Sequence, residues 1–260
     1  MPDLASVESA CLVLVRQAGE LALSHFEAGA RTSARISWKE GGSPVTAADH
    51  AVDSFLAERL AVFLPAALWY SEEQPLSWKM PHNKLAFVID PIDGTRQFMD
   101  GRPGWCISLA LVADGVPVLG IVHTPVLDET LHGFAGGGAF RNGKRVSKLP
   151  APGDTLRITG PMHSAEFLRK RVTTPVEPLA HISALARRIA LTITGAHDLA
   201  LARPGAHDWD IAAADCLLRE VGGGLRGIDG RSIGYPLDGS DLPAFLAGET
   251  TLIEKITRSP

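Results

Sequence analysis

Two aspartates that could bind a cation lie at the end of an apolar segment in the first half of the chain. Residues 85–89, Leu-Ala-Phe-Val-Ile, form the kind of apolar run that predicts a buried strand, and Asp90 follows directly. Pro91 cannot donate a backbone hydrogen bond, so the strand is expected to end there. Asp93 and Gly94 come next, and glycine permits a tight turn or a close approach of the backbone to a ligand.

The stretch from Asp90 to Thr95 therefore offers two carboxylates, the Ile92 carbonyl and the amides of Gly94 and Thr95. Hard cations such as Mg²⁺ bind oxygen ligands of this kind, and backbone amides at the start of a helix bind phosphate oxygens. The structural alternative is a plain turn, because Asp93-Gly94 is a common turn dipeptide. The hexapeptide alone leaves both interpretations open.

Other acids near predicted element ends have structural alternatives of their own. Glu72 and Glu73 lie in a segment, residues 70–75, that is expected to be mobile, and adjacent acids are more often surface residues than ligands. Asp49 comes three residues after Thr46 at the start of a predicted helix, which is the spacing of a capping box.

A second acidic stretch opens another predicted helix, which the three glycines 222–224 end. Asp208 fits its N-cap and Asp210 its first turn, where carboxylates satisfy free amides and compensate for the helix dipole. Both aspartates can thus be explained without any ligand.

The combination of these acids is harder to explain structurally. The acids at predicted element ends are Glu72, Glu73, Asp90, Asp93 and Asp210. If they met in one place without a cation, they would repel one another and their pKa values would rise. A divalent ion removes that repulsion. Since no histidine or cysteine grouping suits zinc, Mg²⁺ is the expected ion.

Hydrophobic periodicity predicts the elements that would position these residues. Helices are expected over residues 4–26, 46–63, 164–172, 182–194 and 208–221, with a short one from residue 249. Further strands are expected over residues 106–112, 116–123, 131–134, 138–146, 156–159, 199–203 and 244–246, and a loop over 38–44. Turns at Asp114-Gly115 and Asn142-Gly143 join strands into hairpins, which predicts a largely antiparallel sheet after the first two helices.

With 260 residues, the chain is long enough for two domains of moderate size. The best candidate boundary is Pro150-Ala-Pro-Gly153, which combines two prolines and a glycine. We therefore expect an N-terminal α+β domain over residues 1–149 and a C-terminal α/β domain over residues 150–260.

Composition narrows the class of partner. The chain is 45% hydrophobic and 21% charged, with a mean hydropathy of +0.09 and a net charge of −4. No long basic run is present, so neither a nucleic-acid polymer nor an anionic membrane surface is an expected partner. No apolar stretch approaches the ~20 residues of a membrane span, and the N-terminus lacks the pattern of a signal sequence. Cys11, Cys106 and Cys216 lack metal-ligand spacing and are expected to be reduced core thiols of a cytoplasmic protein.

Several of these stretches together resemble the signatures of the inositol monophosphatase superfamily. They are Asp90-Pro-Ile-Asp-Gly-Thr95, Ser71-Glu-Glu73, Trp209-Asp-Ile-Ala-Ala213 followed by Glu220-Val-Gly-Gly223, Ser43-Pro-Val-Thr-Ala-Ala-Asp49 and Gly137-Gly-Ala-Phe-Arg-Asn-Gly143. The matches occur in the family order and span most of residues 39–224. The resemblance implies an α/β fold, an αβαβα layered sandwich, and Mg²⁺-dependent, Li⁺-sensitive hydrolysis of a phosphate monoester of a small metabolite.

The resemblance also implies a role for each matching residue. A first metal ion would be held by Glu72, Asp90 and the Ile92 carbonyl, and a second by Asp90, Asp93 and Asp210, with two or three Mg²⁺ per site. Asp49 and Thr95, together with Glu72, would be catalytic by orienting and deprotonating the attacking water. The substrate phosphate would be bound by Asp93, Gly94, Thr95, His207 and Asp210.

The resemblance leaves the substrate open. The stretch Gly205-Ala-His-Asp-Trp-Asp210 favours 3′(2′),5′-bisphosphate nucleotidase, which converts adenosine 3′,5′-bisphosphate to AMP. Residues 157–194 form a short segment without a paired-serine motif, so inositol-1-monophosphatase ranks nearly level, followed by histidinol-phosphate phosphatase. The second domain is expected to set this choice, and the protein could form a homodimer. A non-enzymatic alternative is a catalytically silent family member that binds a partner, although intact clustered carboxylates argue against it.

Overall fold

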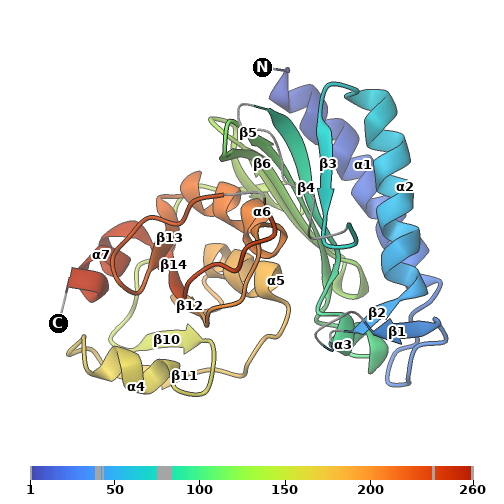
Figure 1. The fold of residues 1–260 in the computed structure, drawn as a ribbon. Coiled ribbons are helices and arrows are strands. Elements are labelled where there is room, and N and C mark those ends of the chain that lie inside the picture. Colours follow the sequence, from blue (N-terminus) through green and yellow to red (C-terminus); the bar gives the residue numbers. More distant parts are fainter. Residues whose placement is uncertain (1, 39–41, 43, 75–83, 236–237, 259–260) are drawn as a thin grey trace.

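Helices and sheets alternate in five layers along the molecule (Figure 1). The computed structural model describes residues 2–38, 42, 44–74, 84–235 and 238–258. From one outer face to the other, the layers are a helix pair, a seven-stranded sheet, a central helix layer, a five-stranded sheet and a second outer helix pair. This is the predicted αβαβα sandwich.

The first helix pair consists of α1 (Leu4–Leu23) and α2 (Ala47–Phe63). Their apolar faces pack on one side of the seven-stranded sheet in a core cluster that includes Cys11, Val52 and Ile89. The Asp3 side chain accepts the Ala5 amide and so caps α1.

The seven-stranded sheet has the order β3-β4-β5-β6-β7-β8-β9. Its strands are β3 (Leu68–Ser71), β4 (Leu85–Asp93), β5 (Cys106–Ala113), β6 (Val116–Thr124), β7 (Glu129–Phe134), β8 (Gly138–Arg141) and β9 (Lys144–Val146). Only the β3–β4 pair is parallel. The predicted hairpins are present, with Asn142 and Gly143 both at positive φ, 47° and 75°, as a tight two-residue turn requires. A short 3₁₀ turn, η1 (Pro125–Leu127), joins β6 to β7.

The central layer contains α6 (Asp208–Arg219), α5 (Leu185–Ala190) and the 3₁₀ turn η2 (Leu191–Thr194). Its side chains belong to one core cluster that extends from the seven-stranded sheet to the five-stranded sheet. Ser108 on β5 donates a hydrogen bond to the Trp209 carbonyl at 3.1 Å, which ties the start of α6 to the first sheet.

The five-stranded sheet has the order β11-β10-β12-β14-β13. Its strands are β10 (Leu156–Thr159), β11 (Val176–Pro178), β12 (Leu199–Ala202), β13 (Gly223–Gly227) and β14 (Phe245–Glu249). The outer pair, α4 (Ser164–Arg169) and α7 (Thr250–Arg258), covers its far face through a third core cluster. The five-stranded sheet lies entirely after the proposed boundary at residue 150, whereas the central cluster joins both halves. The two-domain division therefore stays a prediction.

The most consequential correction concerns β4, which continues through Pro91 to Asp93. Its pairing with β5 shifts between Asp90 and Asp93. Such a bulge leaves Pro91 outside the regular ladder, so its missing amide leaves no vacant hydrogen bond in the sheet. Both aspartates thus lie on the strand rather than beyond it.

Other predicted elements are shorter than expected. The first helix ends at Leu23 rather than residue 26, α4 ends at Arg169, and the helix predicted over 182–194 begins only at Leu185 and tightens to 3₁₀ after Ala190. These segments keep their apolar spacing, but helix ends carry a weaker sequence signal than helix interiors.

Some strands were missed. Residues 70 and 71 belong to β3 rather than to a mobile segment, and β13 starts within the glycine run that was interpreted only as a helix stop. The ends of the loop predicted over 38–44 pair as β1 (Ile36–Trp38) and β2 (Pro44–Thr46), while its residues 39–41 and 43, like residue 75, lie outside the described residues. The three cysteines are free and buried. Within the described ranges, no helix is both long and apolar enough to cross a membrane.

Candidate active site

Three aspartates meet where β4 ends and α6 begins. The carboxylates of Asp90, Asp93 and Asp210 each offer an oxygen, and these oxygens lie within 4.8 Å of one another. Asp90 and Asp93 are buried, while Asp210 is partly exposed. Residues 120 positions apart in sequence are therefore brought into one acidic cluster, as the sequence predicted for these three.

The electrostatics of this cluster favour a bound cation. Burial, and then the nearby charge of Glu72, raises the pKa of Asp90 well above its ordinary value, with Asp93 and Asp210 adding to the effect. Burial followed by repulsion from Asp93 and Glu72 likewise raises the pKa of Asp210. A cation would remove this repulsion, and a set made only of oxygens suits Mg²⁺ better than a soft metal. The residues present thus fit a divalent metal.

Asp93 has a second function that sequence reasoning missed. Its Oδ1 accepts the Leu185 amide at 2.9 Å and its Oδ2 accepts the Ala186 amide at 2.6 Å, both in the first turn of α5. Burial raises the pKa of Asp93 to about 6, even though these amides and Arg188 lower it. The residue at the N-cap of α5 is Ala184, which cannot cap the helix, and that missing cap was the available signal.

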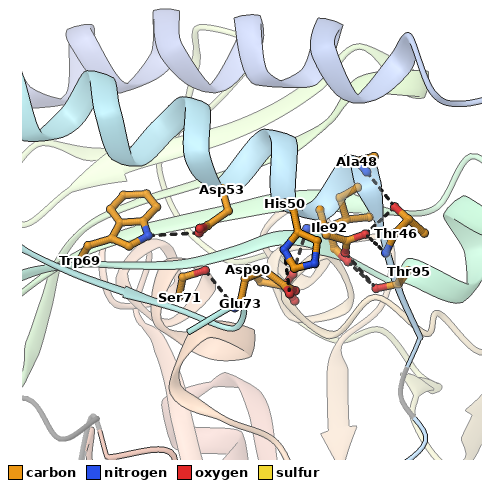
Figure 2. Close-up of polar contacts among 11 residues, drawn as sticks. Thr46, Ala48, His50, Asp53, Trp69, Ser71, Glu73, Asp90, Ile92 and Thr95 are labelled. Atoms are coloured by element: carbon orange, nitrogen blue, oxygen red, sulfur yellow. Dashed lines mark hydrogen bonds and ion pairs between the residues drawn. The ribbon is translucent and has the colours of Figure 1, made fainter. Parts of the chain in front are cut away.

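The side chains of Asp49 and Thr95 also lie together. The Thr95 hydroxyl can donate its proton to either of two acceptors, the Ile92 carbonyl at 3.1 Å (Figure 2) or Asp49 Oδ1 at 3.5 Å. Asp49 Oδ2 accepts both the Thr46 amide at 2.8 Å and the Thr46 hydroxyl at 2.6 Å. The capping box is therefore real, and it orients the other Asp49 oxygen toward Thr95.

Asp49 is poised to exchange a proton near neutrality. Burial is the main cause that raises its pKa to about 7, and repulsion from Glu73 and Glu72 contributes, against the hydrogen bonds from Thr46. A base whose pKa lies near the working pH is the most effective in general acid–base catalysis.

Glu72 and Glu73 follow β3, the strand next to β4. The Glu72 amide donates to the Ile89 carbonyl at 3.1 Å, and the Glu72 charge acts on all four aspartates of the site. Glu73 is not on the solvated surface: its carboxylate lies 3.7 Å from His50 Nδ1, and its side chain is only 3% exposed. The Trp69 indole N–H donates a hydrogen bond to Asp53 Oδ1 at 3.1 Å, which links β3 to α2.

The backbone at Gly94 has a left-handed conformation that favours glycine. Gly94 adopts φ 91° and ψ 37°, and it precedes α3 (Thr95–Met99). A side chain is strained at this φ, and a Cβ here would lie 3.2 Å from Ala184 Cβ. The position therefore requires glycine next to the acidic cluster.

His207 lies beside the cluster and next to Ala206, which lines the cavity described next, but it is not itself among the residues that line this cavity. Its ring stacks on Trp209 with a centroid distance of 4.6 Å, and its Nε2 lies 3.4 Å from Asp241. Its amide donates to Asp210 Oδ2 at 2.7 Å. His207, and not Asp208, is thus the N-cap residue of α6. Its predicted contact with the substrate stays a prediction.

A cavity of about 690 Å³ opens from the acidic cluster toward the five-stranded sheet. Asp93 and Asp210 line it, together with Arg188 and Arg203 from the second half of the chain. Arg188 is a buried residue that the sequence did not single out, because an Arg-Arg pair in a helical segment carries no motif for a ligand. A cavity of this size accommodates a small organic ligand.

Comparisons with known proteins agree with this geometry. Residues 3–258 match the model of the inositol monophosphatase family. The chain is 32% identical to the histidinol-phosphatase of Mycobacterium tuberculosis, over 84% of this chain and 86% of the relative. It is also 32% identical to the 3′(2′),5′-bisphosphate nucleotidase CysQ of Aggregatibacter actinomycetemcomitans, over 81% of this chain and 80% of the relative. The solved structure of a Thermotoga maritima IMPase superposes with a TM-score of 0.78 at 25% identity, over 99% and 96% of the two chains.

Proposed function

Because this chain belongs to the inositol monophosphatase family, whose members are phosphoric monoester hydrolases, we propose that it hydrolyses a small phosphate monoester in a Mg²⁺-dependent reaction. The observation that carries the proposal is the meeting of Asp90, Asp93 and Asp210 beside the Asp49–Thr95 pair. The cluster supplies the negative charge for metal ions, and the pair supplies a base near neutrality.

Each residue then has a task. Glu72, Asp90 and the Ile92 carbonyl would hold one ion, and Asp90, Asp93 and Asp210 another. Bound Mg²⁺ supplies Lewis-acid stabilisation of the charge that develops on the phosphate and the leaving oxygen. Asp49 accepts the proton of the attacking water through the Thr95 hydroxyl. The amides of Gly94 and Thr95 donate to phosphate oxygens.

For the substrate we propose a 3′(2′),5′-bisphosphate nucleoside, with inositol 1-phosphate as the second candidate. The relatives do not rank these substrates, because a nucleotidase, a histidinol-phosphatase and an IMPase are all similar to the chain. Phosphate release, measured with and without Mg²⁺, would be compared for adenosine 3′,5′-bisphosphate, inositol 1-phosphate, histidinol phosphate and fructose 1,6-bisphosphate. Release from none of these with Mg²⁺ present would favour the catalytically silent alternative.

The Asp49–Thr95 pair can be tested directly. Thr95→Ala should lower kcat by roughly 10²-fold or more with little change in KM, because the hydroxyl acts on the water rather than on substrate binding. Thr95→Ser keeps the hydroxyl and is the matched control, with kcat near that of the wild type. Equal kcat in the alanine and serine variants would contradict the role of the hydroxyl.

We expect Li⁺ to inhibit phosphate release by replacing the Mg²⁺ ion that Asp93 and Asp210 would hold. Li⁺ is close to Mg²⁺ in size but has half its charge, so it can occupy a loosely held site without stabilising the leaving oxygen. Inhibition should strengthen at saturating substrate, and equal concentrations of Na⁺ or K⁺ should not reproduce it. Full activity in tens of millimolar Li⁺, by the same phosphate assay, would count against this second site.

A further inference from the structure

The guanidinium of Arg188 is buried beside the acidic cluster with most of its hydrogen-bonding capacity unused. The residue is 5% exposed, and its Nη1 donates to the Ile182 carbonyl at 2.9 Å. His181 Nδ1 lies 3.5 Å from Nη1, but it is itself 3.0 Å from the Gly160 carbonyl and must donate its own proton there. Within the described part of the chain, Nε has no acceptor at all. The guanidinium N–H groups of a buried arginine normally donate to acceptors.

The charge of Arg188 is also incompletely balanced. Asp93 and Asp210 are the acids that act on it, and both belong to the cluster proposed to hold metal ions. Once divalent ions are bound, those carboxylates no longer provide free negative charge to the arginine. Arg203 lies close enough to repel Arg188 and lines the same cavity. Neither arginine has an ion pair with a carboxylate of the described residues. Two like charges facing one cavity favour an anion between them.

The rest of the cavity wall indicates the body of the ligand. Apolar side chains make up much of it, among them Ile158, Met162, Pro178, Leu179 and Ala202. A polyol such as inositol carries a hydroxyl on every ring carbon. Against such an apolar wall, many of these hydroxyls would have no hydrogen-bond partner. A flat, largely apolar ring suits it better.

We infer that Arg188, assisted by Arg203, binds a second phosphate group of the substrate, one that is not hydrolysed. The substrate class is then a small bisphosphate with an apolar or aromatic body rather than a monophosphorylated polyol. This inference rests on the proposed function for the phosphate that is cleaved, and it adds the part of the site that distinguishes bisphosphates from monophosphates.

The test uses two substrates that share the scissile 3′-phosphate and differ only in the second phosphate. These are adenosine 3′,5′-bisphosphate and adenosine 3′-monophosphate. The wild-type protein with Mg²⁺ should prefer the bisphosphate in kcat/KM by at least about tenfold, because charge-assisted hydrogen bonds to a buried arginine strongly favour a phosphate. Arg188→Gln should lower this ratio by about 10- to 100-fold, mainly by lowering kcat/KM for the bisphosphate. Arg188→Lys keeps the positive charge but not the paired N–H donors of the guanidinium, and it should give an intermediate bisphosphate-to-monophosphate ratio of kcat/KM.

The neighbouring arginine provides the matched control. Arg187 is on the same helix and also has a buried Nε without an acceptor among the described residues, but its Nη2 lies 3.5 Å from Glu129 and it lines a different cavity. Arg187→Gln removes the same charge and should leave the bisphosphate-to-monophosphate ratio unchanged. An unchanged ratio in Arg188→Gln, or an equal loss on both substrates, would overturn the inference.

A binding measurement separates this inference from the proposed function. Adenosine 5′-monophosphate retains only the second phosphate, and calorimetry can compare its affinity for the wild-type and Arg188→Gln proteins. The inference expects at least about tenfold weaker binding by the variant and unchanged binding of adenosine. Absence of phosphate release together with Arg188-dependent AMP binding would overturn the proposed function alone. Equal AMP affinity in the two proteins would overturn the inference alone.

Discussion

At the scale of single residues, the two aspartates of β4 differ in the backbone amides that their carboxylates accept. Among the described residues, Asp90 Oδ1 accepts the Ile92 amide at 3.0 Å, whereas both oxygens of Asp93 accept amides of α5. Asp90 therefore mainly contributes charge, while Asp93 also joins the end of β4 to the central helix layer. The same substitution should consequently have different effects at the two positions.

Asp90→Asn and Asp93→Asn should both lower phosphate release by roughly 10²-fold or more, since each removes a charged ligand. Asp90→Asn relieves repulsion, so its melting temperature without Mg²⁺ should equal or exceed that of the wild type. Asp93→Asn turns an amide donor toward a backbone donor of α5 and should lose about 1–3 kcal/mol of unfolding free energy. Thermal melts of metal-free protein, beside the phosphate assay, decide this. Near-normal turnover in either variant would show that its carboxylate is not a metal ligand.

At the scale of elements, the position of Asp210 depends on how closely α6 approaches the first sheet. Gly120 on β6 lies directly under this helix, and a Cβ at this position would overlap the Ala213 carbonyl oxygen. The neighbour is backbone, so it cannot rotate away. Gly120 thus sets the distance between α6 and the sheet, and with it the distance from Asp210 to Asp90.

Gly120→Ala should displace α6, lower the free energy of unfolding by about 1–3 kcal/mol and weaken activation by Mg²⁺. Gly19→Ala is the matched control, because a Cβ there meets His123 Nε2 at 2.8 Å and Pro125 Cγ at 3.0 Å in the α1 interface, away from the acidic cluster. It should reduce stability without changing the Mg²⁺ dependence of phosphate release. Equal Mg²⁺ dependence in both variants, from titrations at matched folded fractions, would contradict the proposed role of Gly120.

At the scale of the whole molecule, buried neutral histidines lie in both halves of the chain. His123 on β6 has its Nδ1 2.9 Å from the Thr130 hydroxyl, and His197, before β12, contacts the Arg188 carbonyl through Nε2 at 2.8 Å. Burial lowers the pKa of each histidine to about 4. For His123 the charge of Arg16 acts in the same direction.

The lowered pKa values determine the sign of a pH effect. The unfolded chain takes up protons on these histidines below about pH 6.5, while the folded protein does so only below about pH 4. Their contribution to stability is therefore full above pH 6.5 and is lost as the pH falls toward 4. Between pH 7 and 4.5, the stability difference between wild type and His123→Gln should shrink by up to about 1.4 kcal/mol per pH unit. Denaturant titrations at several pH values measure it, and a difference independent of pH would contradict the burial argument.

The sequence by itself determined most helix and strand types and, through its motifs, the family resemblance that implied the layered fold. Those features follow from local pattern: apolar spacing sets the helix and strand type, and the motif from Asp90 to Thr95 carries its chemistry within six residues. The capping box at Thr46 is equally local, and at Asp49 the structural and functional interpretations are compatible, because each carboxylate oxygen has its own partner.

Only the tertiary structure decided what reaches the site from elsewhere in the chain. The α5 amides on Asp93, the approach of α6 over Gly120 and the charge of Arg188 acting on Asp93 all depend on contacts between residues about 90 positions apart. No local pattern encodes such contacts, since they arise when two sheets pack against one helix layer. Pro91 illustrates the same limit: its residue type predicts the end of a strand, but pairing with β5 provides a bulge that accommodates it.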